Sequence, residues 1–172
     1  MNEIREIVTK AIVGKGKKII RIKENVVPRN EAFSILGCWI INHEFEAGIT
    51  ENNRVEIVGN FEINIWYAYD DNTKTDIAKK IVGYSQQVNT RQIVKEINDN
   101  SQDVLVRILQ QPTCTNARIV NSEIEVDIVL EVVAEIIGET KMMVTVFTQM
   151  ETCDPIDDDF ENEINENFIN PN

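Results

Sequence analysis

Residues 55–69, VEIVGNFEINIWYAY, alternate between apolar and polar side chains. The odd positions run from Val55 to Tyr69 and are almost all apolar, whereas most of the even positions are polar. Successive side chains of a β-strand point to opposite faces, so this period of two predicts a strand with one buried face. Because the stretch is long for one strand, we interpret Gly59 as a bulge or bend within it.

The strand runs into the polar segment Asp-Asp-Asn-Thr at residues 70–73, which has two interpretations. Asp and Asn favour turns, since their side chains bond the nearby backbone and Asn tolerates positive φ. The carboxylates of Asp70 and Asp71 could instead bind a metal, but no convergent partners are evident. A hairpin loop explains every residue of the segment, and we expect a second strand over residues 76–88.

Further strands are expected on both sides of this hairpin. Residues 123–136 alternate from Ile124 to Ile136, and a Gly-Glu-Thr turn at 138–140 is expected to lead back into a strand over 141–147. Residues 18–26 and 103–111 are also strand candidates, with Pro112 as a break. The pattern predicts an all-β, mainly antiparallel fold with a β-sandwich-like core over residues 18–150.

The N-terminus has a different period. Its apolar residues recur at intervals of three and four, as on one face of a helix, and Gly14 and Gly16 would end it. Lysines near the end of the segment suit the helix dipole. We expect a short helix in a self-association segment, residues 1–17, because such a helix needs a partner surface. The candidate contact residues are Ile4, Ile7, Val8, Ala11, Ile12, Lys15, Lys17 and Lys18.

The C-terminal segment, residues 151–172, contains eight Asp or Glu and no Lys or Arg. It has too few apolar residues to fold alone, so we expect an acidic, largely disordered tail. Four apolar residues nevertheless recur at intervals of four and would form one stripe of a helix docked on a partner protein: Ile156, Phe160, Ile164 and Phe168. A solubilising tail remains the alternative. Cys153 is expected to be exposed and available for an intermolecular cross-link.

The charge distribution argues against several functions. The net charge of −12 disfavours nucleic-acid binding, since phosphates would be repelled. No apolar run could cross a membrane, and the charged N-terminus is unlike a signal peptide, so a cytoplasmic origin is expected. Residues 1–23 carry seven Lys or Arg against two Glu, and this basic end could attract the acidic tail of another copy. Ordinary surface charge is the other interpretation.

No arrangement of residues points to catalysis or to a cofactor. His43 is the single histidine; we expect it at a rim near a strand end, on the opposite strand face from Cys38. Cys38 and Cys114 are interpreted as small buried apolar residues, and three cysteines do not support a closed disulfide framework. No metal-ligand or nucleotide-binding spacing is present. We therefore expect a protein that is not an enzyme.

Several stretches, in this order along the chain, resemble the CotE family of outer spore-coat morphogenetic proteins. They are REIVTKAIVGKGKK (5–18), SILGCWIINHEFEA (34–47), VEIVGNFEINIWYAYDDNTKT (55–75), ILQQPTC (108–114) and AEIIGETKMMV (134–144). Two features depart from the expected family pattern: Cys38 replaces a glycine in LGCW, and the tail is short and rich in asparagine.

The resemblance implies a non-enzymatic protein made in the mother-cell cytoplasm during sporulation. It would self-assemble into a layer of the spore coat, bind the inner coat scaffold protein and recruit outer spore-coat proteins. It also implies multimerisation through the N-terminal segment and client deposition through the tail. The alternative is a β-sandwich module that binds a glycan or small ligand, since Trp66, Tyr67 and Tyr69 could stack on sugar rings.

Overall fold

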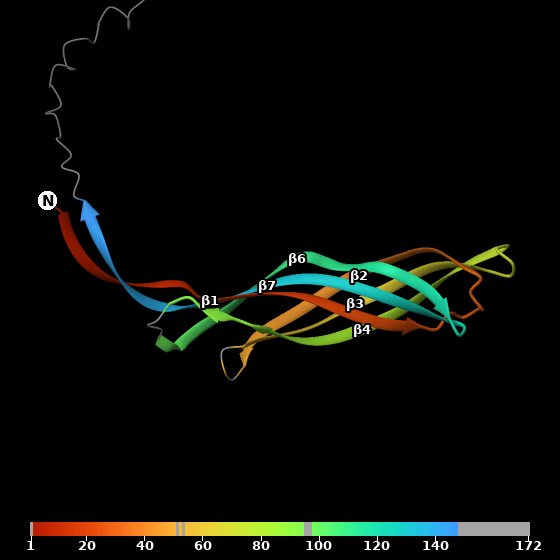
Figure 1. Cartoon of the computed structure of the whole chain (residues 1–172), viewed down its shortest axis with the longest axis horizontal. Helices are drawn as coiled ribbons and strands as arrows, with labels where there is room; N and C mark the ends of the chain where they lie inside the picture. Colours follow the sequence, from red (N-terminus) through yellow and green to blue (C-terminus); the bar gives the residue numbers. More distant parts are fainter. Residues whose placement is uncertain (1, 51, 53, 95–97, 148–172) are drawn as a thin grey trace, which may run out of the picture. The chain divides into compact units, whose positions relative to one another are not determined.

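The computed structural model describes residues 2–50, 52, 54–94 and 98–147. Every regular element among these residues is a β-strand, and the strands are drawn in Figure 1. They are β1 (Asn2–Val26), β2 (Ser34–Thr50), β3 (Arg54–Tyr69), β4 (Lys74–Asn89), β5 (Arg91–Gln92), β6 (Asn98–Val120) and β7 (Glu123–Phe147). The expected all-β fold is therefore confirmed for the described part of the chain.

The strands form two sheets, with the orders β2-β3-β4 and β5-β1-β7-β6. The first sheet is an antiparallel meander, and β6 and β7 form an antiparallel hairpin in the second. Ion pairs from Lys15 to Glu135 and from Lys23 to Glu125 show that β1 and β7 also run in opposite directions. The chain divides into two compact units: residues 7–142, and a smaller unit whose described part is residues 2–6 and 143–147.

The inner faces of the two sheets share one apolar core within the larger unit. Phe61, Ile63 and Tyr67 of β3 and Ile124 and Leu130 of β7 are completely buried in it. They occupy the odd positions of β3 and the even positions of β7, as the sequence alternation predicts. Each such side chain contributes about 1.5–3 kcal/mol relative to its exposed state.

The helix expected near the N-terminus is absent, and these residues form the first half of β1 instead. The spacing of three and four arises because Ile7-Val8 and Ala11-Ile12 are adjacent apolar pairs, which place one residue on each face of a strand. The segment is also rich in β-branched residues, which favour strands over helices. Pairing with β7 then decides between the two interpretations.

Gly14 and Gly16 do not end an element but lie inside β1. A Cβ on Gly16 would come within 2.2 Å of the carbonyl oxygen of Asn89, and one on Gly14 within 3.4 Å of Ile136 Cδ1. The first distance shows that the backbone of β1 passes too close to Asn89 for a side chain at Gly16, whereas the second is an ordinary contact. Glycine is therefore required at Gly16 for close approach, which is one of its known uses within strands.

The turns are set by residues that adopt positive φ. Asp70, Asp71 and Asn72 have φ of 54°, 52° and 63° and connect β3 to β4, which confirms the predicted hairpin loop. The prediction of a turn at 138–140 is wrong, because β7 continues through these residues. Gly138 does not have the positive φ that such a turn would use, and neither does any other glycine among the described residues. The hairpin turn between β6 and β7 is at Asn121 and Ser122, both with positive φ.

Two further interpretations are corrected at the strand irregularities. Pro112 lies within β6 rather than between strands, where the register with β7 shifts between Gln110 and Thr113. Such irregularities are where a strand tolerates proline. At Gly59 the pairing of β3 with β4 is unbroken, and the irregularity lies on β2 between Ile41 and Glu44.

Gly59 leaves room for the carbonyl oxygen of Glu44 and for the ring of Tyr84, whose hydroxyl would lie 2.7 Å from a Cβ there. The ring crosses from β4 and its hydroxyl lies 2.6 Å from His43 Nε2 on β2. His43 Nδ1 donates to Gln111 Oε1 of β6 over 3.0 Å, since an amide oxygen only accepts. His43 is therefore half-buried in the middle of β2, not at a strand end.

Candidate interaction surfaces

The outer face of the β1–β7–β6 sheet carries acidic residues of β7 between basic residues of β1 and β6. Glu135 pairs with Lys15 at 3.1 Å and with Arg107 at 3.0 Å, and Glu131 pairs with Lys17. At the other end of the strands, Glu125 accepts from Lys23 and Arg118. These pairs follow directly from the alternation of β7, which turns its acids outward. The face is thus charged but largely neutralised within the chain.

Glu135 is the most buried member of this charge ladder, with 4% of its surface exposed. The hydrogen bond from Lys15 lowers the pKa of its carboxyl, and Arg107 acts in the same direction, while burial opposes them. The carboxylate therefore remains charged in a position that would be unfavourable without its two cations.

The three candidate lysines of the self-association segment all have partners within the chain. Lys15 and Lys17 pair with β7, and Lys18 donates to Gln86 Oε1 at 3.0 Å and to the carbonyl oxygen of Gln87 at 2.8 Å. An acidic tail from another copy would have to compete with these contacts.

The outer face of the β2–β3–β4 sheet is apolar at one end. Trp39 of β2, Trp66 of β3 and Ile77 of β4 share this face in the strand registers, with exposed fractions of 41%, 44% and 46%. Their neighbours include Ile41 and the more exposed Ile81. We call these five residues the tryptophan face. Exposed apolar patches of this kind mark contact surfaces in many soluble proteins.

The register shows what surrounds Trp66. It lies directly opposite Gly37 on one side and Ile77 on the other, so its indole faces away from the core, whereas Tyr67 is fully buried. The ring of Trp39 lies 3.4 Å from where a Cβ of Gly37 would be and covers that glycine. Gly37 thereby leaves room between the two tryptophans.

Polar groups lie within the tryptophan face as well. Asn64 is directly opposite Trp39 and is only 3% exposed, although it points outward. Its amide donates to Glu62 Oε1 at 2.9 Å, and Lys79 approaches the same oxygen at 3.8 Å. Asn64 thus lies between the two exposed indoles, and Glu62 lies beyond it, opposite Ile41.

The first half of β1 is a second apolar surface. Before Gly14 it pairs only with β7 among the described strands, because β5 contacts it only near Gly14 and Lys15. In the larger unit Val8 and Ile12 are 62% and 42% exposed, Ile7 is exposed and Ala11 is half-buried. In the smaller unit Ile4 is exposed. The predicted apolar contact residues are therefore accessible, but on a strand.

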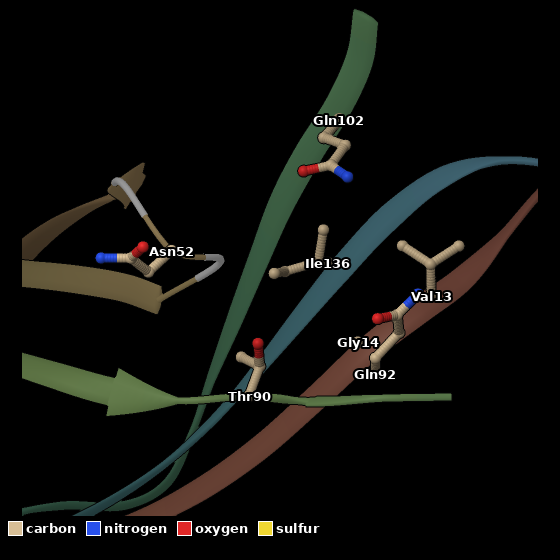
Figure 2. Close-up of a pocket in the computed structure, with 7 residues that line it drawn as sticks. All are labelled: Val13, Gly14, Asn52, Thr90, Gln92, Gln102 and Ile136. Atoms are coloured by element: carbon tan, nitrogen blue, oxygen red, sulfur yellow. The ribbon is translucent and has the colours of Figure 1, made fainter. Parts of the chain in front are cut away.

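A half-open pocket of about 240 Å³ lies where β1 and β7 meet the ends of other strands, as Figure 2 shows. It is lined by Val13, Gly14, Asn52, Thr90, Gln92, Gln102 and Ile136. These residues supply amides, one hydroxyl and apolar groups, but no ionisable or aromatic side chain. The pocket therefore has no group suited to acid–base chemistry or to stacking on a sugar ring.

The other sites considered in the sequence are the tail, a metal site and a membrane-spanning segment. The docking candidates Ile156, Phe160, Ile164 and Phe168 lie outside the described residues, as does Cys153. Within residues 2–50, 52, 54–94 and 98–147 no cluster of three His, Cys, Asp or Glu could hold a metal ion. The same residues include no helix long and apolar enough to cross a bilayer.

Comparison with models of protein families finds a match over nearly the whole chain. The family model described as outer spore coat protein E (CotE) matches residues 3–171 of the chain. No curated protein and no solved structure matches the chain significantly. The match covers both sheets and the C-terminal segment together.

Proposed function

The chain belongs to the outer spore coat protein E (CotE) family, and we therefore propose that it is a self-assembling, non-enzymatic scaffold of the spore coat. It is made in the mother-cell cytoplasm, forms a layer around the developing spore with copies of itself, and holds other coat proteins there. The inner coat scaffold protein and the outer spore-coat proteins are its partners. The observation that carries the self-assembly proposal is the exposed apolar strand at the start of β1.

The start of β1 is suited to pairing with another copy. A two-stranded ribbon is marginally stable by itself, and β1 has an unpaired edge there in the described part of the chain. Val8 and Ile12 are 62% and 42% exposed, so covering their side chains in a contact is favourable. Strand addition at this edge satisfies the backbone and covers the side chains in one step.

A charge placed on the apolar side of this strand tests the proposal. Val8→Asp should reduce the size of the assembly measured by light scattering at micromolar concentration, because it buries a carboxylate in the contact. Asn60→Asp is the matched control, since it adds the same charge at an exposed position of β3, in the other sheet. A monomeric wild-type protein, or equal assembly of both variants, would contradict self-association through β1.

Point substitutions are preferable to deletion of residues 1–17. Val13 is buried in the core, and β1 continues without interruption from the segment into the packed sheet. Deletion would therefore remove part of the fold together with the contact surface. A loss of assembly in such a deletion would not distinguish the two causes.

Client recruitment is proposed for the tail, as an amphipathic helix that folds on its partner. Phe160→Ala combined with Ile164→Ala should weaken the binding of coat proteins in a pull-down from sporulating-cell extract, while the oligomer size stays the same. Asn162→Ala with Asn165→Ala serves as the matched control, because these residues lie between the apolar positions. Unchanged client binding by the apolar variant would refute the docking helix.

A second candidate function is supported by the tryptophan face. Trp39 and Trp66 expose their indoles on one sheet surface, with Asn64 between them and Glu62 beside Asn64. Trp66→Ala should abolish retention by soluble polysaccharides in affinity electrophoresis and leave assembly intact if the chain is a glycan-binding module. Equal mobility of wild type and variant in every polysaccharide gel would exclude this alternative.

A further inference from the structure

Two free cysteines meet where the two sheets adjoin. Cys38 comes from β2 and Cys114 from β6; these two strands are in contact, and the Cys38 thiol interacts with that of Cys114. Both are half-buried and pack against the shared core. Cys38 is opposite Ile65 on β3 and Cys114 is opposite Ile128 on β7, so each thiol belongs to the inner face of its own sheet.

The surrounding strands hold the two cysteines in place. His43, five positions after Cys38, binds Gln111, three positions before Cys114, and thus links the same two strands at 3.0 Å. This second contact shows that β2 and β6 lie alongside each other in opposite directions over this stretch. Both strands are within the larger compact unit. The proximity of the thiols is therefore a consequence of strand arrangement and not of one flexible side chain.

A metal site at this pair is not supported, because the described residues contain no group of three His, Cys, Asp or Glu that could hold an ion. Covalent linkage of the two sulfurs remains the chemistry available to two adjacent thiols. A bond between β2 and β6 would join the two sheets at their seam. It would close a loop of 76 residues, the difference between positions 38 and 114, and so restrict the unfolded chain strongly.

We propose that Cys38 and Cys114 form an intramolecular disulfide that locks the two sheets together when the protein meets a small-molecule disulfide oxidant. The thiolate of one cysteine attacks the oxidant and releases one reduced thiol. The second cysteine then attacks the mixed disulfide and releases the other. The protein loses two protons and two electrons, and the oxidant disulfide is reduced to two thiols. This inference is independent of the proposed scaffold function.

The environment of Cys38 affects how this reaction proceeds. Burial raises the pKa of the Cys38 thiol, and the hydrogen bond with Cys114 adds to the effect. A thiol in this state is a weak nucleophile, so oxidation is slow and needs long equilibration. The pair is thereby distinguished from exposed cysteines, which react first.

The test uses the full-length chain carrying Cys153→Ser, which removes the third cysteine. The protein is equilibrated with oxidised glutathione, alkylated with iodoacetamide, digested without reduction and analysed by mass spectrometry. We expect a linked pair of peptides containing Cys38 and Cys114, a protein mass lower by two hydrogen atoms, and a higher Tm that returns to its original value after reduction.

Two controls isolate the bond. Cys38→Ser and Cys114→Ser, each in the Cys153→Ser background, should show no change of Tm on oxidation. The proposal is overturned if both thiols of the Cys153→Ser protein are alkylated after equilibration. It is also overturned if each carries glutathione, or if the linked peptides derive only from dimers. The first experiment decides the question even if a serine variant fails to fold.

Discussion

The outer face of the β1–β7–β6 sheet carries Glu131 and Glu135 between bases, whereas the outer face of the β2–β3–β4 sheet carries Trp39, Trp66 and Ile81. The inner faces of the two sheets are both apolar and pack in the same core, to which β2, β3 and β4 also contribute aromatic side chains. The chemical contrast between the two sheets is therefore greatest on the sides that face away from this core.

The outer face of the β1–β7–β6 sheet has its acidic side chains paired within the chain. The outer face of the β2–β3–β4 sheet leaves large apolar side chains uncovered. The acids of β7 pair with cations on both neighbouring strands, so the charges of this face are largely neutralised within the chain. The indoles and isoleucines of the tryptophan face remain exposed, and covering them would be favourable. Substitutions on the two faces test this contrast. The loss in free energy of unfolding should be larger when the replaced side chain is more buried and better paired within the chain.

Reversing one charge at the centre of the charged face should have the largest effect. Glu135→Lys places a third cation beside Lys15 and Arg107 in a buried position, and we expect the free energy of unfolding to fall by about 3–5 kcal/mol in urea titration. Glu46→Lys, an exposed reversal on the other sheet, should change it by no more than about 0.5 kcal/mol. Equal effects of the two reversals would show that Glu135 is not held by its neighbours.

Neutralising the same residue should have a smaller effect that depends on pH. Glu135→Gln should lower the free energy of unfolding at neutral pH by about 1–3 kcal/mol, since two cations lose their partner. The pKa of Glu135 is lowered by folding, so its carboxylate stabilises the fold above the unfolded-state pKa of about 4.3. This contribution is lost as the pH falls through the folded-state pKa.

The pH dependence is measured by urea titration of both proteins between neutral and acidic pH. The difference between wild type and Glu135→Gln should shrink as the pH falls below about 4. A difference that stays constant over this range would mean that the carboxylate charge is not what the two cations stabilise.

Removing an exposed member of the charge ladder should matter less. Lys23 contacts Glu125 at 3.2 Å and Asp127 at 3.5 Å, but its side chain is 59% exposed. Lys23→Ala should therefore lower the free energy of unfolding by only about 0.2–1 kcal/mol, and high salt should abolish most of the difference. A loss that persists at a salt concentration of about 1 M would indicate that the aliphatic part of Lys23, rather than its charge, stabilises the sheet.

The smallest change in stability is expected on the tryptophan face. Ile81 is 73% exposed, so Ile81→Lys should alter the free energy of unfolding by no more than about 0.5 kcal/mol. Val82→Lys is the contrasting control, because the neighbouring residue is buried and a charge there should destabilise strongly. A large loss with Ile81→Lys would show that the apolar side of this sheet is already covered within the chain.

The strands with a clear period of two could be predicted from the sequence because burial of one face is a local pattern. β3 and the turn at residues 70–73 are the best examples. The N-terminal helix was wrongly predicted because adjacent apolar pairs such as Ile7-Val8 fit a helix stripe and a two-faced strand equally well. The β-branched residues of the segment favour the strand, and pairing with β7 decides the outcome.

Glycines were also misinterpreted where their neighbours come from distant parts of the sequence. Gly16 is required by the carbonyl oxygen of Asn89 and Gly59 by the ring of Tyr84, and neither contact is visible in a single stretch of chain. The same holds for Cys38 and Cys114, which belong to different sheets. Their meeting depends on how β2 lies beside β6.

Local sequence was sufficient to establish which side chains of β3 and of residues 123–136 in β7 face inward, since alternation and turn chemistry act over a few residues. It was not sufficient to show that the lysines of β1 neutralise the acids of β7, which follows from the arrangement of the strands in space. The same arrangement places Trp39 and Trp66 on one exposed face. These outcomes depend on pairing between strands far apart in the chain, and the local pattern of either strand does not encode that pairing.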